Sequence, residues 1–234
     1  NSDWVNTDVS VTLTYTDSGG SGIKDKQYYW RNDISTPVIW DDYSTNAVQS
    51  LEGIWYLHYR VTDNAGNAAV GYFGPYKIDK TAPTGTYTLN PATWTNQNVV
   101  IAFTASDEGG SGVKRIQKPD GTWVTGTSTT YTATDNGTYN FVVEDNAGNT
   151  ATVSAVVSNI DRIPPTGTYS LNPATWTNQN VVITFIASDE GGSRVKRIRK
   201  PDGIWVTDIS TTYIVASNGI YDFVVEDNAG NTTT

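Results

Sequence analysis

Apolar and polar residues alternate along most of the chain, in short stretches that are separated by turn residues such as Pro119-Asp120-Gly121 and Asn136-Gly137. An alternation with a period of two indicates strands that bury one face. In the best-defined part of the chain the pattern predicts seven strands, over residues 85–89, 97–106, 113–118, 122–125, 129–134, 138–144 and 150–159. Short strands with a turn signal about every 8–12 residues are typical of an antiparallel β-sandwich. Tyr139, just after Asn136-Gly137, fits the tyrosine corner of such sandwiches.

The chain repeats itself at long range. Residues 83–152 align with 165–234 without a gap at an offset of 82, and 55 of the 70 pairs are identical. Residues 1–80 are a diverged third copy, in which Trp4 corresponds to Trp94 and 63–67 corresponds to 145–149. Units of this size predict independent domains. We therefore expect an N-terminal repeat (1–80), a middle repeat (81–162) and a C-terminal repeat (163–234).

Two of the three repeats are expected to be incomplete sandwiches. The N-terminal repeat has no counterpart of the first strand (85–89), and the C-terminal repeat has no counterpart of 153–159. The simpler interpretation is a segment of a longer tandem array. The alternative is that a neighbouring chain supplies the strand, which would give a head-to-tail homo-assembly by strand sharing.

The composition excludes several classes of protein. The net charge of −9 disfavours nucleic acid as a partner, and without cysteine there is neither a disulfide nor a thiolate metal site. No apolar run reaches the roughly 18 residues needed for membrane insertion. The one histidine, His58, alternates with Leu57 and Tyr59 and is predicted to face solvent. A catalytic triad or a two-histidine zinc site is therefore not expected, and the chain is predicted not to be an enzyme.

Several motifs resemble one known family. Asp-Asn-Ala-Gly-Asn occurs at 63–67, 145–149 and 227–231, Asp-x-x-x-Pro linkers occur at 79–83 and 161–165, and a Gly-Ser-Gly-hydrophobic step occurs at 110–113. Together these motifs resemble the tandem bacterial immunoglobulin-like (Big-type) domains of exported surface proteins and adhesins. The resemblance implies an extracellular or cell-surface protein and a role as a stalk, a spacer or an accessory module. Arg194 departs from the pattern, because the other two copies have Gly22 and Gly112 at this position.

Aspartates recur at the positions where the repeats meet. Asp145 and Gly148 suit a type I turn, and that interpretation explains the Asp-Asn-Ala-Gly-Asn motif without a ligand. With seven alternating strands, however, one linker and two loops reach the same pole of a sandwich. This topology predicts that two sets of three carboxylates converge, Asp79, Asp107 and Asp145 in one set and Asp161, Asp189 and Asp227 in the other.

Three carboxylates with backbone or Asn oxygens suit a calcium ion, and the resemblance agrees, since some bacterial immunoglobulin-like adhesins hold calcium at domain junctions. No cofactor is required for such a fold, and calcium is the one candidate. The rival interpretation is a calcium-free joint in which Lys80 or Arg162 neutralises the acidic pole.

Tryptophan and tyrosine are the remaining candidates for binding. Core packing is the ordinary role of such side chains. The alternative is a carbohydrate platform, for which the N-terminal repeat is the best candidate, with Trp30 and Trp40 as the expected glycan contacts.

Five of the 15 differences between the middle and C-terminal repeats replace threonine by isoleucine. The alternation places them mostly on the outer face, as an apolar contact patch or as neutral drift, at 186, 204, 209, 214 and 220.

These observations predict three tandem immunoglobulin-like antiparallel β-sandwiches in an extended rod. The expected function is a non-catalytic structural spacer of a bacterial cell-surface or secreted protein. The alternative is a carbohydrate-binding accessory module of a secreted glycan-active enzyme or adhesin. The expected partner is a second copy of the chain, or a glycan or protein receptor of a host or cell wall.

Overall fold

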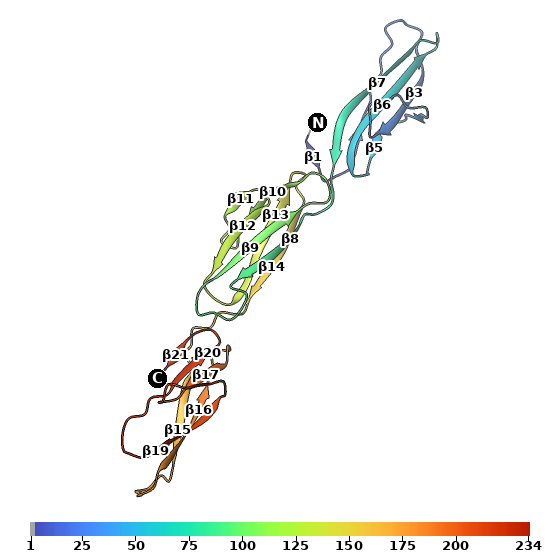
Figure 1. The fold of residues 1–234 in the computed structure, drawn as a ribbon. Helices are drawn as coiled ribbons and strands as arrows, with labels where there is room; N and C mark the ends of the chain where they lie inside the picture. The colour runs from blue at the N-terminus through green and yellow to red at the C-terminus, as the bar shows by residue number, and fades with distance from the viewer. Residues whose placement is uncertain (1–2) are drawn as a thin grey trace. The chain divides into compact units, whose positions relative to one another are not determined.

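The computed structural model describes residues 3–234. All the regular secondary structure in that range consists of β-strands (Figure 1). The fold is that of tandem immunoglobulin-like sandwiches, as predicted. Internal contacts divide the chain into two units, and the division passes through the middle repeat. One unit consists of residues 1–86, 104–129 and 140–153. The other consists of residues 87–103, 130–139 and 154–234. Among the described residues there is no helix that could cross a membrane.

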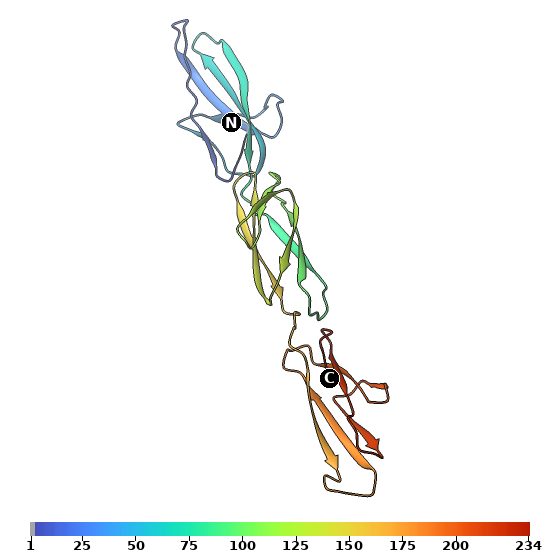
Figure 2. The same cartoon turned by 90° about the vertical axis from the view of Figure 1, so that its left-hand side faces the viewer.

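The N-terminal repeat forms two sheets, which Figure 2 shows from a second side. The larger sheet has the order β1-β7-β6-β3-β4, and the smaller one pairs β2 with β5. Strand β1 runs parallel to β7, whereas the other pairs of this repeat are antiparallel. The strands are β1 Trp4–Val5, β2 Val9–Val11, β3 Ile23–Arg31, β4 Asp41–Asp42, β5 Ala47–Gln49, β6 Gly53–Asp63 and β7 Ala68–Ile78.

The middle repeat contains the seven predicted strands, each within about two residues of its predicted bounds. They are β8 Thr84–Asn90, β9 Val99–Ser106, β10 Val113–Gln117, β11 Trp123–Thr125, β12 Ser128–Ala133, β13 Gly137–Asp145 and β14 Thr150–Val157. Their sheet orders are β11-β10-β13-β14 and β12-β9-β8. On β9, residues 99, 101 and 103 are buried and alternate with less buried residues, so the period-two pattern selected the correct inner face.

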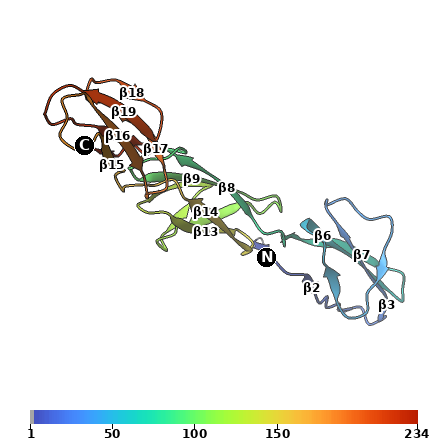
Figure 3. The same ribbon diagram turned by 90° about the horizontal axis from the view of Figure 1, so that it is seen from below.

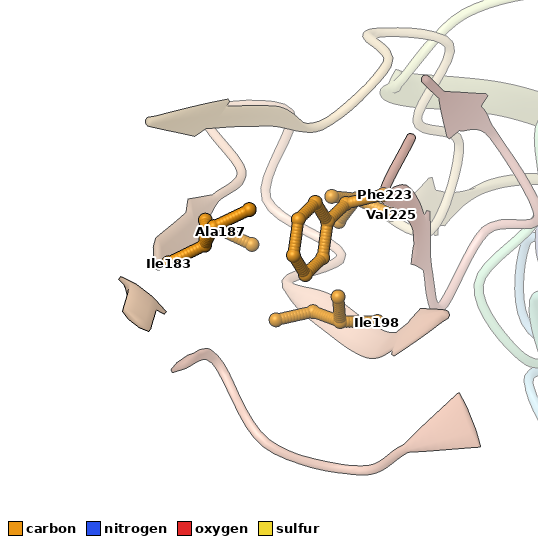
Figure 4. Close-up of a cluster of buried hydrophobic side chains, with 5 residues drawn as sticks. All are labelled: Ile183, Ala187, Ile198, Phe223 and Val225. Carbon is orange, nitrogen blue, oxygen red and sulfur yellow. The ribbon is translucent and has the colours of Figure 1, made fainter. Parts of the chain in front are cut away.

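The C-terminal repeat repeats this arrangement with the orders β15-β16-β19 and β18-β17-β20-β21. Figure 3 labels five of its strands, β15 to β19. Its strands are β15 Thr166–Asn172, β16 Val181–Ser188, β17 Val195–Arg199, β18 Trp205–Val206, β19 Ser210–Val215, β20 Val224–Asp227 and β21 Thr232–Thr233. Its core comes from both sheets. Figure 4 shows the Phe223 side chain among the others of this cluster, which are Ile183, Ala187, Ile198 and Val225.

One side of the C-terminal core is open. A groove of about 1270 Å³ is lined by Leu171, Phe185 and Phe223, among other residues. In the middle repeat, strand β14 carries two side chains that are almost completely buried, Ala155 and Val157. The corresponding strand of the C-terminal repeat, β21, is only two residues long. The groove exposes apolar side chains of the C-terminal repeat, including Leu171.

The tyrosine corner is present in both of the closely related repeats. Tyr139 Oη donates to the carbonyl oxygen of Asp135 at 2.7 Å, and Tyr221 Oη donates to that of Ser217 at 2.8 Å. A tyrosine anchored in this way fixes the crossover that leads into the following strand. This hydrogen bond is typical of the immunoglobulin-like sandwich.

The threonine-to-isoleucine differences lie on the outer face, as predicted. All five isoleucines are exposed, between 51% for Ile186 and 92% for Ile220. The C-terminal repeat therefore carries more apolar surface than the middle repeat at matched positions.

The prediction for His58 was wrong. Its side chain is 3% exposed, and Nε2 lies 3.0 Å from the carbonyl oxygen of Asp33. Its ring also lies against Tyr72, at a centroid distance of 5.6 Å. The alternation along β6 shows which residues share a face, but it does not show that the loop after β3 covers that face. His58 is a hydrogen-bonded interior residue.

Arg194 has a backbone conformation that favours glycine, with a φ of 70°, where the middle repeat has Gly112 with a φ of 80°. A residue with a β-carbon is disfavoured in this region by about 1–2 kcal/mol. We expect Arg194→Gly to stabilise the C-terminal repeat by about 0.5–1 kcal/mol, because the added freedom of the unfolded chain offsets part of the gain. Thermal unfolding of the full chain measures this effect. Lys196→Gly, at an exposed strand position, is the control and should destabilise.

Candidate functional site: two aspartate triads

The predicted sets of aspartates converge in the structure. Asp79 follows β7 directly, Asp107 follows β9, and Asp145 is the last residue of β13. Each offers one carboxylate oxygen, and these three atoms lie within 4.8 Å of one another. We call this group the first triad. The second triad, Asp161, Asp189 and Asp227, meets the same distance limit.

The linker carboxylate of the first triad is completely buried. Asp79 Oδ1 accepts a hydrogen bond from the backbone N–H of Thr81 at 3.1 Å, and Oδ2 accepts one from that of Ser111 at 3.0 Å. Gly109 approaches this carboxylate so closely that a β-carbon there would lie 1.9 Å from Oδ1. The linker is thus held by the loop that follows β9.

The Asp-Asn-Ala-Gly-Asn turn supplies the second carboxylate. Asp145 is also fully buried; its Oδ1 accepts from the backbone N–H of Asn149 at 2.8 Å, and its Oδ2 accepts from Asn149 Nδ2 at 2.7 Å. Gly148 has a φ of 93°, the left-handed conformation that the turn requires. Asn149 Nδ2 also donates to the backbone oxygen of Asp79 at 2.9 Å. One asparagine therefore ties the turn to the linker.

Asp107 is the more accessible member of the first triad. Its Oδ2 accepts from the backbone N–H of Gly112 at 2.7 Å, and its Oδ1 accepts from that of Gly109 at 3.3 Å. These bonds fold the loop after β9 around the carboxylate. The loop thus keeps a carboxylate oxygen of Asp107 within 4.8 Å of one from Asp79 and one from Asp145.

The second triad repeats these contacts almost atom for atom. Asp161 Oδ2 accepts from the Ser193 backbone N–H at 3.0 Å, and Asn231 Nδ2 donates to the Asp161 backbone oxygen at 2.9 Å. Burial raises the pKa of the Asp161 carboxyl, but hydrogen bonds from Ser193 and Ile163 outweigh it, so the pKa lies below its usual value. The carboxylate form is the favoured one near neutral pH.

The two candidate neutralising cations pair elsewhere. Lys80 Nζ contacts Asp8 and the backbone oxygen of Ser50. Arg162 donates to the Thr134 backbone oxygen at 2.7 Å and to Asn98 Oδ1 at 2.8 Å. Neither set of contacts includes a triad carboxylate, so the hydrogen bonds found for these carboxylates come from backbone, amide and hydroxyl groups.

The N-terminal repeat has the same two turns, but among its described residues no third acidic side chain lies at metal-binding spacing. Asp17 Oδ2 accepts from the Gly22 backbone N–H at 2.7 Å, and Asp63 Oδ1 accepts from that of Asn67 at 2.8 Å. Hydrogen bonds from Gly19 and Gly22 hold the pKa of Asp17 below its usual value. Among residues 3–234, groups of three acidic side chains at metal-binding spacing occur only at the two triads.

The donor set fits a hard cation. Carboxylate, hydroxyl and backbone oxygens are the ligands that Ca²⁺ prefers, and it takes six to eight of them. A carboxylate oxygen has about two lone-pair sites, so an oxygen that accepts one N–H can still face an ion. Three carboxylates so close together repel one another. In each triad, two of the three are at most 3% exposed to solvent.

The two tryptophans expected to contact glycan are both half-buried. Trp30, on β3, packs edge-on against Tyr76 with a ring-centroid distance of 5.3 Å. Its indole nitrogen is buried and has no hydrogen-bond partner. Trp40 belongs to no strand and immediately precedes β4. Trp30 thus packs against a neighbouring ring, and its role as a glycan contact stays a prediction.

Comparison with known proteins gives a partial match. No family model matches the chain. A 194-residue stretch, 72% of this chain, is 30% identical to Exoglucanase B of Cellulomonas fimi, and it spans 17% of that protein. The chain is also similar to two solved structures. One, of fibronectin(III)-like modules of Clostridium thermocellum CbhA, has 16% identity and a TM-score of 0.32 and covers 67% of this chain and 88% of that one. The other, Bacteroides ovatus SGBP-B in complex with a mixed-linkage heptasaccharide, has 14% identity and a TM-score of 0.24 and covers 98% of this chain and 60% of that one.

Proposed function

We propose that the chain is a non-catalytic spacer made of three tandem immunoglobulin-like repeats of a bacterial secreted or cell-surface protein. The observation that carries the proposal is the joint that is built twice from the same residues. In each joint, a linker aspartate is locked by hydrogen bonds to two loops of the repeat that follows it. A protein that repeats its joints fixes the spacing of its domains. The similarity to part of an exoglucanase supports a secreted module.

We further propose that each triad binds one calcium ion. The ion would neutralise three carboxylates that otherwise repel one another, and it would join the linker to both loops. Extracellular modules of this kind bind calcium with dissociation constants near 10⁻⁴–10⁻³ M. A tenfold excess of calcium over that constant stabilises the folded state by about 1.4 kcal/mol. Calcium would thus stiffen the joints rather than fold the repeats.

Calcium titration tests this proposal. After removal of divalent ions with a chelator, we expect calcium to raise the melting temperature of the full chain saturably at millimolar concentration. Isothermal titration calorimetry should give about two sites per chain. The double variant Asp107→Asn/Asp189→Asn should lose most of this response, because each triad loses one charged ligand but keeps its linker in place.

Asp120→Asn is the matched control, because this aspartate lies in an exposed turn and accepts a backbone N–H in the same way. It should leave the calcium response unchanged. A melting temperature that is the same with calcium and with chelator would contradict the calcium proposal. It would leave the spacer proposal intact, because the linker hydrogen bonds do not need an ion.

The alternative function, a carbohydrate-binding accessory module, rests on the exoglucanase relative and on Trp40. Soluble glucan oligosaccharides provide the discriminating measurement. Binding by the full chain that is lost on Trp40→Ala, but kept on Trp123→Ala, would favour this alternative over the spacer.

A further inference from the structure

Basic side chains are concentrated at one strand of the C-terminal repeat. Strand β17 and the residues beside it contain five of the 15 lysines and arginines of the chain within seven positions. They are Arg194, Lys196, Arg197, Arg199 and Lys200. The whole chain has a net charge of −9, so the charge of this segment is opposite in sign. A local excess of cations attracts anionic partners.

Three of the five cations have a carboxylate partner. Lys196 Nζ lies 2.6 Å from Oε1 of Glu226, and Arg197 Nη2 lies 2.6 Å from Oε2 of the same residue. Hydrogen bonds from Lys196 and Arg197 hold the pKa of the Glu226 carboxyl below its usual value, against the effect of burial. Lys200 Nζ lies 3.7 Å from Oδ2 of Asp202. Five cations thus face two carboxylates.

The other two cations, Arg194 and Arg199, are absent from the middle repeat, which has Gly112 and Gln117 at these positions. Both arginines are exposed. In the part of the chain that the structure describes, no ion pair is found for either side chain. Two of the differences between these closely related repeats therefore add an unpaired cation to the same segment.

Two of the arginines flank an indole ring on the outer face of the sheet. Trp205, on β18, lies opposite Arg199 in the register, and Cζ of Arg199 is 5.8 Å from the centroid of the Trp205 ring. Cζ of Arg197 is 4.0 Å from the same centroid. Ile198, between the two arginines, is completely buried, so the arginines and the tryptophan share the opposite, outer face. We call Arg197, Arg199 and Trp205 the basic face.

We propose that the basic face binds an acidic polysaccharide, a sugar polymer that carries carboxylate groups. The guanidinium of Arg199 has a planar fork of N–H donors, which matches the two oxygens of a carboxylate. Trp205 is 36% exposed, so part of its flat apolar ring is open to the C–H face of a sugar. A neutral glucan leaves the arginine unused, and an acidic peptide has no sugar ring for the indole. The site uses no triad carboxylate and does not include Trp40.

Binding of the full chain to immobilised polygalacturonate in EDTA tests the proposal. We expect binding that weakens as salt is added, because salt screens exposed charges. The methyl-esterified polymer, which has the same sugars without the charge, should not bind. Poly-L-glutamate, which has the charge without the sugars, should bind more weakly than polygalacturonate. Because EDTA is present throughout, these results do not depend on whether the triads bind calcium.

The middle repeat supplies the variant that removes the site. Arg194→Gly/Arg199→Gln introduces the two residues that the middle repeat has at these positions. Arg194→Gly also removes a side chain from a backbone position with a φ of 70°, so the variant should fold. We expect it to bind polygalacturonate about tenfold more weakly or worse, because a charge-assisted hydrogen bond of at least about 1.4 kcal/mol is lost.

Gln117→Arg is the reciprocal variant, because the middle repeat already has the rest of the face. Cζ of Arg115 lies 4.1 Å from the centroid of the Trp123 ring, and Gln117 lies opposite Trp123 in the register. We expect Gln117→Arg to create a second site and to raise the amount of polygalacturonate bound per chain. Thr132→Arg, which adds the same charge at an exposed position of the other sheet, is the control and should not.

Four results would overturn the proposal. They are no binding of the unmodified chain to polygalacturonate, undiminished binding by Arg194→Gly/Arg199→Gln, an equal gain from Thr132→Arg, and equal or tighter binding of poly-L-glutamate. The last result would identify the partner as an acidic polypeptide.

Discussion

Replacing Phe103 by alanine should lower the free energy of unfolding of the middle repeat by about 3–5 kcal/mol, the usual cost of removing a buried phenylalanine. The same change at Phe185, its counterpart in the C-terminal repeat, should cost clearly less. Phe103 is 1% exposed, whereas Phe185 is only half-buried and lines the open groove. A side chain that is already in contact with water loses less on truncation, and the space that it leaves opens to solvent rather than forming a cavity.

The two repeats are similar enough to make this a controlled comparison. Differential scanning calorimetry of the full chain, with each variant measured separately, assigns every shift to one repeat. Ile116→Ala and Ile198→Ala are the matched controls, because both isoleucines are completely buried, and the two changes should cost about the same, in the range of about 2–5 kcal/mol. Equal costs for Phe103→Ala and Phe185→Ala would contradict an open groove. They would mean that the groove is filled in solution, as the strand-sharing hypothesis requires.

The alternation of apolar residues was sufficient to place the strands of the middle repeat. A strand with one buried face has a period of two, and the turns beside it need glycine, proline or asparagine, so both signals lie within a few residues of each other. The convergence of Asp79, Asp107 and Asp145 could also be predicted, because it depends only on which end of the sandwich each strand reaches. Both inferences use local sequence and topology alone.

The features that sequence reasoning missed depend on contacts between distant segments. His58 contacts Asp33 in the loop that follows β3, and no pattern along β6 reveals that cover. The bond from Asn149 to the linker joins residues that are 70 positions apart. The Gly-Gly pair at 109–110 did carry a signal, because two glycines that follow Asp107-Glu108 suggest a close approach of the backbone. The identity of the approaching groups, the Asp79 carboxylate and the Trp4 ring, required the structure.

Gly109→Ala should be the most disruptive single change at the first triad. The added methyl group would lie 1.9 Å from Oδ1 of Asp79, so the carboxylate has to leave its position. It would then lose the hydrogen bonds from Thr81 and Ser111 at a site without solvent to replace them. Hydrogen bonds to a charged group contribute about 1.5–3 kcal/mol each, so we expect a loss of about 2–4 kcal/mol after partial relaxation. Gly191→Ala should have the same effect at Asp161, where the corresponding distance is also 1.9 Å.

Gly137→Ala separates this steric effect from the general cost of changing a glycine. The nearest atom to a β-carbon at Gly137 is Tyr139 Cε2 at 4.0 Å, and the backbone there does not have a positive φ. This variant should therefore be close to neutral in thermal and urea unfolding. If Gly109→Ala is equally neutral, the Asp79 carboxylate is not held in the buried position described here, and the locked linker that supports the spacer function is wrong. If Gly109→Ala destabilises and also abolishes one of the two calcium sites, the linker lock and the ion depend on the same carboxylate position.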